Sequence, residues 1–151
     1  MRREFTDCSH SIHLSEELTW KLTINSFILQ RFGYNSNMNS KRCRSLNGKT
    51  TSVKGPVLYW MERDQRLQDN WALIHAQNLA LKAGVPLGVA FVLPKHFLDC
   101  TWRHYDFMLE GLKELELACK AKGFGFFLLL GEPDKLLPAF IEKHKISHVV
   151  T

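Results

Sequence analysis

Residues 57–61 read Val57-Leu58-Tyr59-Trp60-Met61, an unbroken apolar run that follows Gly55-Pro56. The run is too short for a helix, and its residue types suit a strand that is buried on both faces. A charged segment without glycine, from Glu62 to Asn70, comes directly after it. The sequence therefore predicts a buried strand at 57–61 and then a polar loop that leads into a helix.

The alternation of short apolar runs with longer helical stretches continues to the last residue. Cap residues, glycines and prolines mark the ends of each stretch. The elements predicted after the first strand are a helix capped by Asp69 or Asn70 and ended by Gly84, a strand at 87–93, a helix capped by Thr101 that ends near Gly123, a strand at 124–130, a helix beginning at Pro133 and a strand at 147–151.

This βαβαβαβ order predicts the α/β class, with a Rossmann-like parallel sheet and right-handed crossovers. The sequence ends at the fourth strand, without the loop and helix that should follow it in an open parallel sheet. We therefore expect an incomplete, truncated domain. Because an incomplete sheet exposes an unpaired edge and an apolar face, we also expect the isolated chain to self-associate.

The excess positive charge lies at the N-terminal end. The chain has 151 residues and a net charge of +5; residues 1–55 carry nine Lys or Arg and four Asp or Glu, whereas residues 56–151 carry eleven of each. We predict a basic, partly disordered segment at 1–55 and an α/β domain at 56–151. The basic segment is expected to hold a short helix at 15–29 and a flexible linker at 34–55. Its Lys41-Arg42-Cys43-Arg44 cluster fits a nuclear localisation signal or a weak phosphate-binding patch, but the favoured interpretation is a solvated linker.

Several kinds of site lack their sequence pattern. There is no uncharged apolar run of 18 residues and no signal peptide, so we expect a soluble, intracellular protein without a membrane partner. The four cysteines and seven histidines show no ligand or nucleophile spacing, so no metal site is predicted. The turn after the first strand lacks the glycines of a dinucleotide-binding loop. No residue is assigned as catalytic, and cofactor-binding residues stay unknown. Trp60 and Trp71 are interpreted as packed core residues.

The charged loop has two interpretations. Arg63, Asp64 and Arg66 have the chemistry for a hydrogen-bonded ion-pair cluster at the carboxyl edge of the sheet, which would clamp another domain. The alternative is an exposed salt bridge worth less than about 1 kcal/mol.

The run from Tyr59 to Leu73 resembles the N-terminal signature of class II cyclobutane pyrimidine dimer photolyases, which are light-driven DNA-repair flavoenzymes. Glu62 differs, because the family most often has Ser there. The likeness covers roughly residues 41–151 and continues through Ala76–Leu81, Pro94–Asp99, Arg103–Leu112 and Leu128–Gly131.

The resemblance implies that this chain is the N-terminal α/β antenna domain of a deoxyribodipyrimidine photo-lyase. The parent family binds UV-damaged DNA and splits pyrimidine dimers by electron transfer from reduced FAD. Its flavin-binding, dimer-binding and electron-relay positions all lie beyond residue 151, so the isolated chain is expected to be inactive. The resemblance also implies a nuclear location in a eukaryote and an antenna chromophore of the deazaflavin or folate type.

By the same resemblance, Arg63, Asp64, Arg66 and Asn70 lie at the edge where the antenna domain faces the FAD-binding helical domain. The loops after the first, second and fourth strands are expected to border the antenna chromophore. Two other functions stay open. One is a non-catalytic α/β module that binds a nucleotide, a nucleic acid or a protein, and the other is a fragment of a cryptochrome-like photosensor.

Overall fold

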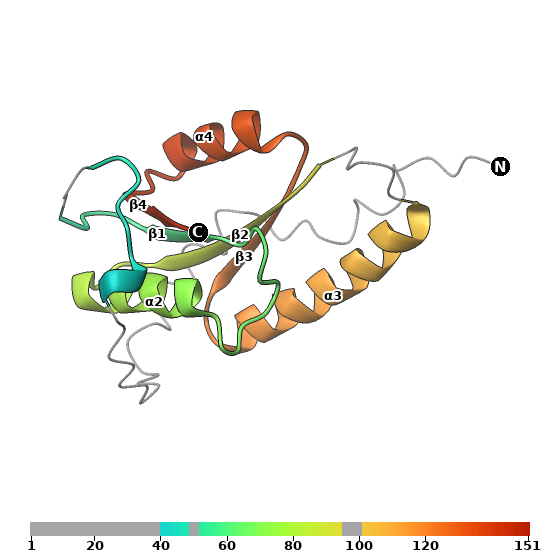
Figure 1. The fold of residues 1–151 in the computed structure, drawn as a ribbon, viewed down its shortest axis with the longest axis horizontal. Coiled ribbons are helices and arrows are strands. Elements are labelled where there is room, and N and C mark those ends of the chain that lie inside the picture. The colour runs from blue at the N-terminus through green and yellow to red at the C-terminus, as the bar shows by residue number, and fades with distance from the viewer. Residues whose placement is uncertain (1–39, 49–51, 95–100) are drawn as a thin grey trace.

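The computed structural model describes residues 40–48, 52–94 and 101–151 (Figure 1). The helix predicted at 15–29 lies outside the described residues. The elements are η3 (Ser40–Arg42), β1 (Val57–Trp60), α2 (Trp71–Ala83), β2 (Leu87–Leu93), α3 (Trp102–Ala121), β3 (Gly125–Leu130), α4 (Pro133–Lys143) and β4 (His148–Val150).

The four strands form one parallel sheet in the order β3-β2-β1-β4. β1 is paired on both sides, with Val57 opposite Leu87 of β2 and opposite His148 of β4. Helices α2 and α3 lie on one face of the sheet and α4 lies on the other (Figure 1). The predicted α/β class and parallel sheet are confirmed.

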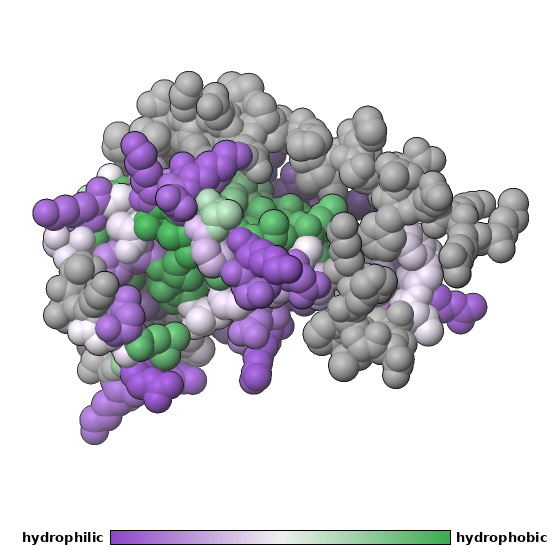
Figure 2. Space-filling view, turned by 90° about the horizontal axis from the view of Figure 1, so that it is seen from above, coloured by the Kyte–Doolittle hydropathy of each residue, from purple (hydrophilic) through white to green (hydrophobic). Residues whose placement is uncertain are grey.

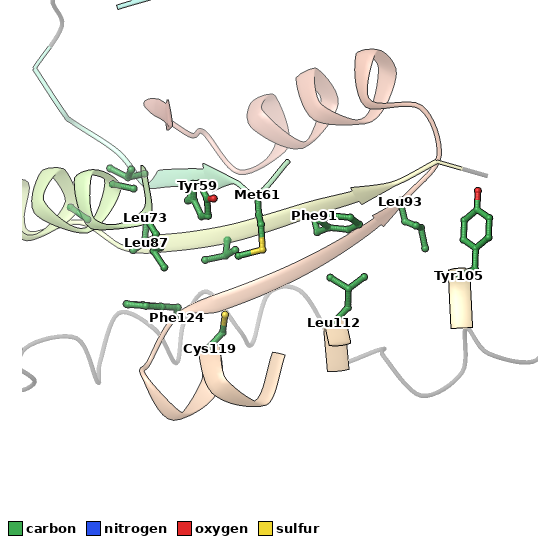
Figure 3. Close-up of a cluster of buried hydrophobic side chains, with 14 residues drawn as sticks. Tyr59, Met61, Leu73, Leu87, Phe91, Leu93, Tyr105, Leu112, Cys119 and Phe124 are labelled. Carbon is green, nitrogen blue, oxygen red and sulfur yellow. The ribbon is translucent and has the colours of Figure 1, made fainter. Parts of the chain in front are cut away.

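The larger core fills the space between the sheet and helices α2 and α3 (Figure 3). Helix α3 contributes three buried residues that are spaced seven positions apart, Tyr105, Leu112 and Cys119. Such spacing places side chains on one face of a helix. Helix α3 therefore packs one apolar stripe on the sheet.

The smaller core lies on the α4 face and includes Leu58, Phe127 and Phe140. The rings of Phe127 and Phe140 are 5.1 Å apart between centroids. Helix α4 is the one described helix on this face, and Figure 2, viewed from that side, shows apolar side chains between charged ones. Val149 of β4 is paired with buried Leu58, yet its own side chain is 41% exposed. The described part of the chain thus leaves apolar surface uncovered beside β4.

The core interpretation is confirmed for one of the two tryptophans. Trp60 is partly buried and packs against the smaller core. The interpretation of Trp71 as a core residue is wrong, because its side chain is 48% exposed. Helix α2 buries the stripe formed by Leu73, Ala76 and Ala80, and a residue two positions before Leu73 points to the opposite side of a helix.

The remaining differences from the sequence prediction lie at element ends. Four residues predicted at strand ends lie one residue outside the observed strands: Met61, Phe124, Ser147 and Thr151. Gly84 ends α2 with φ 63°, a left-handed conformation that favours glycine, as predicted.

None of the helices described here combines the length and apolarity needed to cross a membrane.

Candidate functional site

The loop from Met61 to Asn70 leaves the carboxyl end of the central strand. The chain runs from β1 to β2 and β3 on one side and then returns to place β4 on the other side of β1. In open parallel sheets, ligands bind beyond the carboxyl ends of the strands, at the point where the strand order reverses. That point lies between β1 and β4, so the Met61–Asn70 loop is the candidate site.

Asn70 holds this loop together from inside. Its side chain is 1% exposed, and its Oδ1 accepts a hydrogen bond from the backbone N–H of Leu73 at 3.0 Å, which caps α2. Its Nδ2 donates to the Tyr59 hydroxyl at 2.9 Å and to the carbonyl oxygens of Asp64 at 3.1 Å and Arg66 at 3.0 Å. One buried amide therefore joins the strand, the loop and the helix.

The turn at Asp69 lets the Asn70 side chain reach the strand and the loop. Its φ of 49° is in the left-handed region, which Asp tolerates better than most residues. The resulting turn places Asn70 as the N-cap with an extended backbone, φ −105° and ψ 97°. Of the two predicted caps, Asn70 is therefore the cap and Asp69 is the turn that precedes it.

Tyr59 is the buried partner of Asn70 on the strand. Burial raises the pKa of the Tyr59 hydroxyl; the Asn70 hydrogen bond lowers it by less, and the Asp64 carboxylate and the Arg66 guanidinium have still smaller effects, Asp64 raising it and Arg66 lowering it. The phenol is therefore neutral at physiological pH and accepts the Asn70 hydrogen bond in that form. Because their hydrogen bonds are made to each other, Tyr59 and Asn70 serve the structure of the loop.

The charged side chains of the loop point outward. Arg66 Nη2 lies 3.8 Å from Asp64 Oδ1 with both side chains more than half exposed, and it also donates to the Asp69 carbonyl at 3.3 Å. This single long contact corresponds to the exposed salt bridge of the sequence analysis rather than to a bidentate cluster, and it contributes well under about 1 kcal/mol. Arg63 is exposed as well. The loop thus presents Arg63, Asp64 and Arg66 to solvent, while Asn70 is buried beneath them.

The comparisons with known proteins cover this site. A family model described as DNA photolyase matches residues 57–151, which include all four strands, the loop and helices α2, α3 and α4. The chain belongs to the DNA photolyase family.

Curated members of the photolyase family also resemble this chain. The deoxyribodipyrimidine photo-lyase of Potorous tridactylus is 54% identical over 94 residues, which are 62% of this chain and 18% of that enzyme. The Arabidopsis thaliana enzyme of the same name is 47% identical over 97 residues, 64% of this chain and 20% of the enzyme. The photo-lyase of Methanothermobacter thermautotrophicus is 32% identical over 101 residues, 66% of this chain and 23% of the enzyme. The chain therefore spans about a fifth of the length of these relatives.

Two contacts at the candidate site were not predicted from the sequence, that of Tyr59 with Asn70 and that of Arg42 with Trp71. Tyr59 lies inside an apolar run, so nothing in the pattern distinguishes it from a core aromatic residue. Arg42 lies 29 positions before Trp71, yet its guanidinium carbon is 5.4 Å from the centroid of the Trp71 ring. Contacts between such distant positions have no local sequence signal. Among the described residues, no group of three or more His, Cys, Asp or Glu is arranged to hold a metal ion.

Proposed function

We propose that this chain is the N-terminal α/β antenna part of a class II deoxyribodipyrimidine photo-lyase, whose intact form repairs cyclobutane pyrimidine dimers in UV-damaged DNA with light. The observation that carries the proposal is the 54% identity with the Potorous tridactylus enzyme over 94 residues. The amino-acid sequence of the Met61–Asn70 loop supports class II in particular. An intracellular location, the nucleus in a eukaryote, follows from the proposed substrate.

The proposal gives the described residues a supporting role. The four exposed or capping residues Arg63, Asp64, Arg66 and Asn70 form the edge that would face a FAD-binding helical domain. Asn70 sets the shape of that edge through its four hydrogen bonds, and the charged side chains would contact the partner domain. Ion pairs that are weak in water gain strength when a second surface removes the solvent around them.

The described residues do not themselves fit a flavin. The turn after β1 has no glycine, and its buried polar groups, Tyr59 and Asn70, are bonded to each other. In the proposed enzyme, reduced FAD would supply the electron from the helical domain. Support for a deazaflavin or folate antenna is positional, because the loop after β1 lies at the reversal of strand order.

A domain exchange tests the proposal. The matching segment of the Potorous tridactylus enzyme is replaced by residues 57–151 of this chain, and light-dependent loss of thymine dimers from irradiated DNA is measured. We expect the hybrid to bind FAD and to repair DNA, because half of the exchanged residues are unchanged. A hybrid carrying an unrelated parallel α/β domain is the control and should not repair DNA, because its loops would not match the surface of the helical domain. A folded, FAD-loaded hybrid of this chain without repair would contradict the proposal.

The isolated 151-residue chain should show no light-dependent repair in the same assay. The reason is that the resemblance places the flavin-binding and dimer-binding positions beyond residue 151. Repair by the purified chain alone, at a rate above that of irradiated DNA without protein, would contradict this expectation.

We also propose that the isolated chain self-associates through the α4 face. Val149 on β4 is paired with Leu58 of the smaller core and is 41% exposed, so an apolar side chain of this face lies uncovered on an outer strand. Light scattering after size exclusion should show oligomers that Val149→Lys reduces. Leu117→Lys, on α3 at 68% exposure, is the control and should leave them unchanged. A monomer at all concentrations would disprove the self-association.

A further inference from the structure

The basic segment 40–48 contacts the domain at the start of α2. The Arg42 guanidinium carbon lies 5.4 Å from the centroid of the Trp71 ring, within the range of a cation–π contact. Trp71 is the first residue of α2, directly after the Met61–Asn70 loop. The segment that the sequence favoured as a solvated linker is therefore placed beside the candidate site by an aromatic contact.

This contact gathers positive charge on one surface. Lys41, Arg42 and Arg44 are all exposed, and neither segment 40–48 nor the first turn of α2 contains an acidic residue. The nearby loop carries both signs, with three acidic side chains, Glu62, Asp64 and Asp69, and two arginines, Arg63 and Arg66. The loop therefore nearly balances its own charge, whereas every charged side chain of segment 40–48 is positive.

Trp71 adds an aromatic ring to these cations. Its side chain is 48% exposed although α2 has a buried stripe elsewhere, so the indole contributes little to the core. Surfaces that bind single-stranded nucleic acids combine cations that contact the phosphates with aromatic rings on which bases stack. A phosphate-rich ligand without bases, or an acidic protein, would use the cations and would have no need of an exposed indole.

We propose that the surface formed by Lys41, Arg42, Arg44 and Trp71, the basic aromatic surface, binds single-stranded nucleic acid. The three cations contact successive phosphates, and a base stacks on the Trp71 indole beside the Arg42 guanidinium. This surface goes beyond the proposed repair function, and its binding does not depend on FAD, on light or on a pyrimidine dimer. Failure of the domain exchange would therefore leave this proposal standing, and the reverse is also true.

The cations are tested by fluorescence anisotropy of a labelled oligothymidylate of about 16 nucleotides with the full 151-residue chain. The triple variant Lys41→Gln, Arg42→Gln, Arg44→Gln should bind at least about tenfold more weakly, and the slope of log K against log salt should fall by about 2, as expected for three phosphate contacts on a single strand. The control is Lys113→Gln, Lys120→Gln, Lys135→Gln, which removes the same charge from exposed positions on α3 and α4. Equal losses in both triple variants would overturn the proposal.

Stacking is tested with two tryptophan variants of similar exposure. Trp71→Leu should weaken oligothymidylate binding by about tenfold or more, because base stacking on an aromatic ring is worth about 1–3 kcal/mol. Trp102→Leu, at the start of α3 and 54% exposed, is the control and should not weaken it. Inorganic polyphosphate, which has no bases, should bind Trp71→Leu and the unmodified chain equally. Similar oligothymidylate affinity in both tryptophan variants, or tighter binding of polyglutamate than of oligothymidylate, would overturn the single-strand assignment, and the second result would indicate an acidic protein partner.

Discussion

Asn70→Ala should lower the free energy of unfolding by about 3 kcal/mol, measured by urea denaturation. The substitution removes the cap of α2 and leaves the Tyr59 hydroxyl and two loop carbonyls without the donor they share. Loss of an N-cap costs about 0.5–2 kcal/mol, and each buried polar group left without a partner adds about 1–3 kcal/mol. Part of that second cost is recovered where water reaches the loop.

Asn70→Asp separates the two roles of the side chain. A carboxylate still accepts the Leu73 N–H bond, but it has no N–H to donate and faces the carbonyls of Asp64 and Arg66. We expect it to destabilise the domain at least as much as Asn70→Ala at neutral pH. Asn78→Ala, on the same helix and partly buried, is the control and should cost less than about 1 kcal/mol. Near-equal stability of Asn70→Ala and Asn78→Ala would refute the structural role given to Asn70.

The Cys119 thiol should resist labelling in the folded chain by a factor of about 1000 or more. Burial, reinforced by the Glu116 carboxylate, raises its pKa from 9.0 to about 12, and its side chain is 0% exposed. The thiolate is the reactive form, so a pKa higher by about three units leaves about 1000-fold less of it at pH 8. The measurement uses a variant with Cys8, Cys43 and Cys100 changed to Ser, labelled with a thiol reagent. Denatured protein is the control, and equally fast labelling in the folded and denatured states would contradict the prediction.

The same shift makes the domain less stable in alkali. The unfolded chain loses the Cys119 proton above about pH 9, whereas the folded chain keeps it until about pH 12, so stability is complete below pH 9 and falls as the pH rises. The slope should approach about 1.4 kcal/mol per pH unit. Tyr59, whose pKa is also raised by burial, adds a loss in the same direction above pH 10. Cys119→Ala should flatten the decline between pH 9 and 10, and an unchanged slope would show that another group is responsible.

Much of the fold was predictable because its signals are local. The strand at 87–93 agrees with β2 at both ends, and Gly84, Thr101 and Pro133 mark helix ends where expected. Proline, glycine and cap residues restrict backbone dihedrals within a few residues, so they act before any tertiary contact forms. The predicted ends of the other three strands differ from the observed ends by at most one residue, because pairing with a neighbouring strand determines where a strand stops.

The candidate site was predictable in place and only partly in chemistry. The sequence indicated the loop after β1 and all four of Arg63, Asp64, Arg66 and Asn70. It gave no sign that Asn70 is buried while the other three are exposed, or that Trp71 turns away from the core. Those facts depend on the rotation of α2 against the sheet, which no single position in the sequence encodes.

The amino-acid sequence alone determined the order of strands and helices, their caps and the family of this chain, because each depends on residue types at short spacing. Only the tertiary structure decided which polar side chain joins the loop to the core and which aromatic ring lies under Arg42. Tyr59 and Asn70 are 11 positions apart, and Arg42 and Trp71 are 29 apart. They meet because burial of the apolar faces of the sheet and helices fixes where each element lies, and polar contacts then form between the groups that this packing brings together.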